Sequence, residues 1–160
     1  MGKYYSLLNG YFSPQINKPN MEASELFILI GGLLSFLMVI FHCYFYRLFQ
    51  WKQEFDKIQL LNHLIFFTIH FALILFFIAF TLLSFVYLKE MASCNGLAFG
   101  LVLCYSLFWL WRTIWQVYYF KIDKSVRKKP LMHYLLIAIF GLLFISYTFP
   151  LIIHVIGHSA

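Results

Sequence analysis

The side chains of this chain that could bind a ligand are histidines, one arginine and two amides, all set among apolar residues. They are His42, Asn62, His70, Arg112, Gln116 and His133. A neutral imidazole can ligate haem iron or a metal ion. An arginine held away from water needs an anion or several hydrogen-bond acceptors. These residue types therefore favour a ligand-binding site over a pair of catalytic carboxylates.

Acidic residues are missing from the places where catalysis would need them. The chain has six Asp and Glu residues, and none lies in the interior of an apolar run. A general acid–base pair, a di-iron carboxylate site and an acidic proton relay are therefore not expected. The three cysteines, Cys43, Cys94 and Cys104, form no CxxC motif, so a disulfide or zinc framework is not expected either. We predict a protein that is not an enzyme.

The composition assigns the chain to the membrane proteins. Hydrophobic residues make up 62% of the 160 residues and charged residues only 11%. Soluble domains are near half apolar and a quarter charged, and a short chain buries a comparatively small share of its surface. A soluble enzyme and a nucleic-acid-binding module are therefore unlikely classes, and an integral membrane protein is predicted. The excess of basic residues lies mainly beside apolar runs, where topology and anionic lipid account for it.

Four apolar runs are long enough to cross a bilayer as helices, which needs about 20 residues each. They cover residues 26–46, 60–88, 96–120 and 131–156. Helices satisfy their own backbone hydrogen bonds in lipid, so the predicted fold is an all-α, antiparallel four-helix transmembrane bundle with up-down topology. We expect one integral membrane domain over residues 1–160, with residues 1–20 forming a polar N-terminal segment outside the cytoplasm. Asn20 or Ser24 is expected to cap the first helix, Pro130 to open the fourth, and Pro150 to kink it.

The basic residues predict the orientation of the bundle. The connections after the first and third runs hold Arg47, Lys52, Lys57, Lys121, Lys124, Arg127, Lys128 and Lys129, and the opposite side holds Lys3, Lys18 and Lys89. The positive-inside rule then places both termini outside the cytoplasm, most simply in a bacterial inner membrane. With this orientation all six candidate residues fall in the cytoplasmic half, where they would form a polar pocket. In the alternative interpretation they are structural or interfacial, with Arg112 extended to the lipid headgroups beside an aromatic belt.

Two kinds of prosthetic group agree with these residues. Haem b held by two histidines would use His42 and His70 first, with Arg112 near a propionate; a quinone would use the same polar pocket. Weaker metal candidates are His42, His70, His154 and His158, of which the last two are four residues apart on the fourth run. A third ligand for a metal at His154 and His158 is not evident in the sequence.

The order of these features resembles a loose group of small bacterial integral membrane proteins with four spans. The matching elements are Asn62 with His70, the segment Phe108-Trp109-x-x-Arg112-x-x-x-Gln116, and His133. The resemblance covers about residues 26–153. It implies a four-span fold and marks the same residues for joint study, but it implies no reaction.

Three functions stay open at this point. The favoured one is a non-enzymatic protein, such as an accessory subunit of a membrane complex, with a ligand pocket lined by His and Arg in the cytoplasmic leaflet. The second is a haem- or quinone-binding redox protein. The third is a component of a small-molecule or anion transporter. The expected partners are the lipid bilayer and either another membrane protein or further copies of the chain; no nucleic acid is expected.

Overall fold

The computed structural model describes residues 18–48, 50, 51, 55, 58–122 and 130–159, with residues 18, 19, 120, 121, 158 and 159 described in backbone only. Its main helices are α2 (Lys18–Leu48), α4 (Leu60–Val86), α5 (Leu88–Ser93), α6 (Leu97–Ile122) and α8 (Pro130–Ser159). Four of them are long and apolar enough to span a membrane. The predicted all-α, up-down four-helix membrane fold is confirmed. The segment 1–17 lies outside the described residues.

The first helix begins before its expected cap, and the second is slightly shorter than its apolar run. Helix α2 already includes Lys18, so Asn20 and Ser24 lie within it rather than at its cap. The Ser24 hydroxyl instead donates to the Asn20 carbonyl one turn earlier, at 2.9 Å. Helix α4 ends at Val86 rather than at residue 88. Tyr87 leaves the helical conformation there, and α5 follows.

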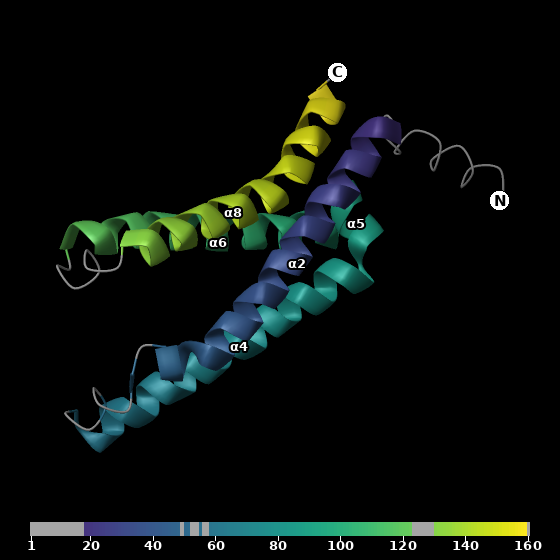
Figure 1. Ribbon diagram of the computed structural model, residues 1–160. Helices are drawn as coiled ribbons and strands as arrows, with labels where there is room; N and C mark the ends of the chain where they lie inside the picture. The colour runs from purple at the N-terminus through teal and green to yellow at the C-terminus, as the bar shows by residue number, and fades with distance from the viewer. Residues whose placement is uncertain (1–17, 49, 52–54, 56–57, 123–129, 160) are drawn as a thin grey trace, which may run out of the picture.

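The turn from α5 to α6 and both ends of α8 follow from local chemistry. Cys94 and Gly96 take positive φ values of 51° and 55°, which turn the chain between α5 and α6. Pro130 is the first described residue of α8, where a missing backbone N–H costs nothing. Pro150 lies within α8, and Figure 1 shows this helix bending toward its C-terminus. The predicted kink is therefore seen, since proline removes a hydrogen bond from a helix interior.

The four long helices form two hairpins that meet at an angle. Figure 1 shows α2 lying beside α4, and α6 lying beside α8. Helix α2 packs on α8 where the hairpins cross, and α5 packs mainly beneath α2. The hairpins diverge toward the end at which α2 and α6 finish and α4 and α8 begin (Figure 1). We call this the basic end, because the connecting sequences there carry most of the lysines and arginines.

A hydroxyl network fastens three helices where the hairpins cross. The Tyr147 hydroxyl of α8 lies 2.8 Å from the Ser84 hydroxyl of α4 and 3.3 Å from the Ser35 hydroxyl of α2. Gly31 allows this approach, because a Cβ placed there would lie 2.8 Å from Cζ of Tyr147. Gly141 marks no such contact, since nothing lies within 4 Å of its ideal Cβ. The small residues of α2, rather than those of α8, therefore determine how closely the hairpins approach.

Candidate functional site

The six residues singled out from the sequence divide into two pairs and two separate residues. His42 and His70 meet between α2 and α4, and Gln116 and His133 meet between α6 and α8. Arg112 lies on α6, against α8. Asn62 has an exposed side chain in the first turn of α4, and no contact places it with the others.

His42 and His70 are each oriented by a backbone carbonyl. Nδ1 of buried His42 donates to the Met38 carbonyl at 2.9 Å, and Nε2 of His70 donates to the His42 carbonyl at 3.0 Å. Their ring centroids are 5.6 Å apart, with the planes inclined by 25°. These two bonds leave Nε2 of His42 and Nδ1 of His70 as the ring nitrogens that could accept a proton or bind a metal.

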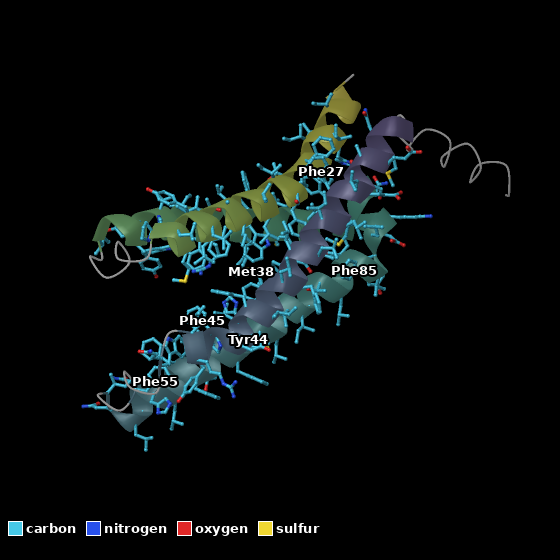
Figure 2. The ribbon with its side chains drawn as sticks, in the orientation of Figure 1. Phe27, Met38, Tyr44, Phe45, Phe55 and Phe85 are labelled. Atoms are coloured by element: carbon cyan, nitrogen blue, oxygen red, sulfur yellow. The ribbon has the colours of Figure 1, made fainter. Side chains whose placement is uncertain are left out.

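Aromatic rings surround the two imidazoles. Phe45 and Trp51 lie against His70, with ring centroids 5.4 and 5.0 Å away, and Phe77 meets His42 edge-on at 4.7 Å. Figure 2 shows Met38 and Phe45 on the side of α2 that faces the α6–α8 hairpin. The histidine pair therefore lies on the inner side of its own hairpin, within an apolar setting.

Arg112 has aromatic partners but no anionic one. Its guanidinium carbon lies 5.2 Å from the ring centroid of Phe140 and 5.8 Å from that of Trp111, within range of a cation–π contact. It makes no hydrogen bond or ion pair with the residues that the structure describes. Both Arg112 and Phe140 are ten residues, about 15 Å, from the ends of their helices at the basic end. The guanidinium is therefore level with the Phe140 ring and does not extend to the helix ends.

A continuous row of rings joins the two hairpins. Phe77 of α4 stacks on Trp109 of α6 at 5.5 Å, and Trp109 stacks on Phe140 of α8 at 5.7 Å. Phe77 also touches His42, and Phe140 also touches Arg112. The row of rings thus runs from His42 on α2 to Arg112 on α6.

Gln116 and His133 form a buried polar contact nearer the basic end. The Gln116 amide nitrogen lies 3.2 Å from Nδ1 of His133, so the amide donates and the imidazole accepts. His133 is only 2% exposed, and it has a further interaction of its own. Because both polar groups satisfy one another, this pair is suited to holding α6 and α8 together.

Sequence reasoning named Trp109 only within the motif of the resemblance and missed Phe140. Trp109 and Phe140 are fully buried and contact Arg112 or its partner ring. A signal for α6 was present: Tyr105, Trp109, Arg112 and Gln116 are spaced by four, three and four residues, the spacing of one helix face. No comparable signal existed for Phe140, which is one of twenty phenylalanines.

The metal candidates gain no third ligand. Among the described residues no three of the types His, Cys, Asp and Glu gather into a group that could hold a metal ion. Nδ1 of His154 donates to the Ser93 carbonyl at 3.2 Å, which ties α8 to the end of α5. The side chain of His158 lies outside the described residues. The site residues, and the haem built on His42 and His70, thus stay predictions.

No protein-family model matches the sequence, and neither a curated protein nor a solved structure is significantly similar to it. The resemblance to small bacterial membrane proteins is therefore supported only as far as the four long apolar helices.

Proposed function

We propose that this protein is a non-enzymatic integral membrane protein, acting as an accessory component, that binds an anionic amphiphile between its hairpins. The observation that carries the proposal is Arg112. Its guanidinium is partly buried within a span, contacts two aromatic rings, and has no hydrogen bond or ion pair among the described residues. A charge in that setting is stabilised by a bound anion, and one that also carries an apolar tail matches the surrounding rings.

The expected orientation places this ligand in the cytoplasmic leaflet. The connections at the basic end hold eight of the twelve lysines and arginines, and Arg112 lies in the half of α6 nearer that end. Anionic lipids attract such basic segments, so they would be concentrated where the hairpins diverge.

The test compares two lipids that differ in charge. The purified protein in mixed micelles is titrated with dioleoyl phosphatidylglycerol or dioleoyl phosphatidylcholine, and bound lipid is counted by native mass spectrometry. We expect the anionic lipid to bind at least about tenfold more tightly, the effect of one charge-assisted hydrogen bond. Arg112→Gln should abolish this preference, and His70→Ala should leave most of it. Equal binding of the two lipids by the unaltered protein would contradict the proposal.

Arg47→Gln is the matched control. Arg47 also carries a guanidinium on a long helix, but its side chain is exposed at the basic end of α2. A loss of preference in both variants would indicate general surface attraction rather than a site at Arg112.

One observation favours a second function, the binding of haem. The His42 and His70 rings lie close together, and in each ring only one nitrogen is bonded to a backbone carbonyl. Two such nitrogens are the ligands of a bis-histidine haem. Protein purified after growth with added haem should then show a Soret band that disappears in His42→Ala. A preparation with no Soret absorbance would exclude haem binding. Uptake of an anion into proteoliposomes would support the third function, transport.

A further inference from the structure

Two buried hydrogen-bonding groups on α6 have no partner. The hydroxyl of Tyr105 and Nε1 of Trp109 are buried, and neither is hydrogen-bonded to any residue that the structure describes. Tyr105 is 4% exposed and Trp109 is fully buried. Buried polar groups are almost always paired in native proteins, so two unpaired donors on neighbouring turns require an explanation.

These donors continue the face on which Arg112 lies. Trp109 precedes Arg112 by three residues, which is about 4.5 Å along the helix, on the side away from the basic end. The indole of Trp109 and the guanidinium of Arg112 both lie against the Phe140 ring, at 5.7 and 5.2 Å. From the basic end inward, α6 therefore offers a charged donor first and neutral donors below it.

We propose that the ligand is a diacyl glycerophospholipid with an anionic headgroup, held by its phosphate at Arg112 and by an ester carbonyl at Nε1 of Trp109. This inference rests on the proposed function and names the ligand of the same site. A glycerophospholipid of the near leaflet carries its phosphate closest to the membrane surface and its ester carbonyls a few bonds deeper. Carbonyl oxygens only accept hydrogen bonds, and indole N–H only donates them. The order of donors along α6 matches the order of acceptors along the lipid.

The seam between α4 and α6 offers a route for the lipid to reach Trp109. These helices meet through rings, with Phe77 on Trp109 and Phe80 stacked on Tyr105 at 3.6 Å. Phe76, which is exposed, and Phe108 meet edge-on beside them. Because Phe76 is the exposed ring of this group, we expect an acyl chain to enter from the bilayer beside it.

The experiment removes the carbonyl from the lipid and the N–H from the protein in turn. The detergent-solubilised protein is titrated with dioleoyl phosphatidylglycerol, with its dialkyl ether analogue, and with dioleoyl phosphatidylcholine. We expect the diester to bind about five- to tenfold more tightly than the diether, the effect of one hydrogen bond. Trp109→Phe keeps an aromatic ring and should bind diester and diether equally, with its preference for the anionic headgroup intact. Tyr105→Phe shows whether the second donor shares the carbonyl.

The three lipids distinguish failure of this inference from failure of the proposed function. If the unaltered protein binds diester and diether phosphatidylglycerol equally, but both more tightly than phosphatidylcholine, the ester contact is wrong and the anion site stands. If the headgroup makes no difference, both proposals fall. Trp115→Phe is the matched control, because Trp115 is a tryptophan on the same helix whose ring contacts Tyr118 and Tyr119; it should retain the ester preference. Comparison of the lipids in unaltered protein decides the question even if Trp109→Phe does not fold.

Discussion

The guanidinium carbon of Arg112 lies 5.2 Å from the ring centroid of Phe140, at the same level of the membrane-spanning bundle. A cation–π contact compensates for only part of the lost hydration of a guanidinium, about 2 kcal/mol or somewhat more where water is excluded. The rest of the lost hydration energy is not recovered, because Arg112 makes no ion pair or hydrogen bond with the described residues. The first prediction follows from this imbalance.

Removing the charge should stabilise the ligand-free protein. Arg112→Met keeps a flexible apolar chain against Phe140 and eliminates the unpaired cation, so we expect the free energy of unfolding to rise by about 1 kcal/mol. This corresponds to about 2–4 °C in the midpoint of thermal unfolding, measured in a neutral detergent. Added phosphatidylglycerol should raise the midpoint of the unaltered protein only. A variant that is less stable under both conditions would show that Arg112 has a purely structural partner.

The Tyr147 hydroxyl should contribute measurably to stability. Tyr147→Phe removes the bonds to Ser84 and Ser35 and leaves both hydroxyls without this partner. Interhelical hydrogen bonds in membrane proteins contribute about 0.6 kcal/mol each, so we expect a loss of roughly 1 kcal/mol in unfolding by denaturing detergent. Tyr118→Phe is the control, because that side chain is exposed and should show no change. Equal stability of the two variants would show that the hydroxyl network does not stabilise the fold.

Two glycine variants should change the free energy of unfolding in opposite directions. In Gly31→Ala the new Cβ would lie 2.8 Å from the Tyr147 ring, so the hairpins must separate, at a cost of about 1–3 kcal/mol. In Gly141→Ala the new methyl meets nothing within 4 Å, and the helix gains about 0.5–1 kcal/mol from the better helix former. Thermal unfolding of both variants in the same detergent checks the contrast. Similar midpoints would mean that α2 and α8 are packed less closely than the structure shows.

The thiol of Cys94 should resist alkylation at mildly alkaline pH. Burial raises its pKa from 9.0 to about 12, and the thiolate is the reactive form. In a variant carrying Cys43→Ser and Cys104→Ser, labelling by iodoacetamide at pH 9 should be roughly two orders of magnitude slower in detergent than after denaturation in SDS. Rapid labelling of the folded protein would show that the α5–α6 turn opens.

The same thiol should make the free energy of unfolding fall as the pH rises above 9. Between pH 9 and about 12 the unfolded chain loses the Cys94 proton while the folded chain keeps it. The unfolded state then binds fewer protons, so stability falls as pH rises through this window. Replacement of Cys94 by alanine should remove that part of the pH dependence, measured as the thermal midpoint at pH 8 and pH 10.

The sequence predicted the helices well and their rotations poorly. Length and apolarity determine where a helix can span a bilayer, and Pro130 and Pro150 act locally, so these features could be read from the chain. The end of α4 at Val86 could not, because Tyr87 and Leu88 continue the apolar run past it. Helices that are apolar on every side carry no stripe that indicates which face points inward.

The same limit explains why the sequence grouped the site residues only by depth. The predicted topology places His42, His70, Gln116 and His133 in one half of the bundle, but which of them meet depends on helix rotation. The contact between Arg112 and Phe140 depends on the rotation of α8, which is determined by packing at Tyr147 and by the aromatic row. The unpaired donors of Tyr105 and Trp109 could not be recognised before burial was known, since either side chain is ordinarily satisfied by a neighbour or by water.

The divergence of the two hairpins has a mechanical consequence for the bilayer (Figure 1). The molecule is fastened at the crossing and spread at the basic end, so its outline differs between the two leaflets (Figure 1). We therefore expect its insertion energy to change with membrane curvature, as it does for a wedge-shaped inclusion. Where a membrane bends so that the leaflet at the basic end is stretched, the spread arms relieve part of that tension, and the protein should accumulate there.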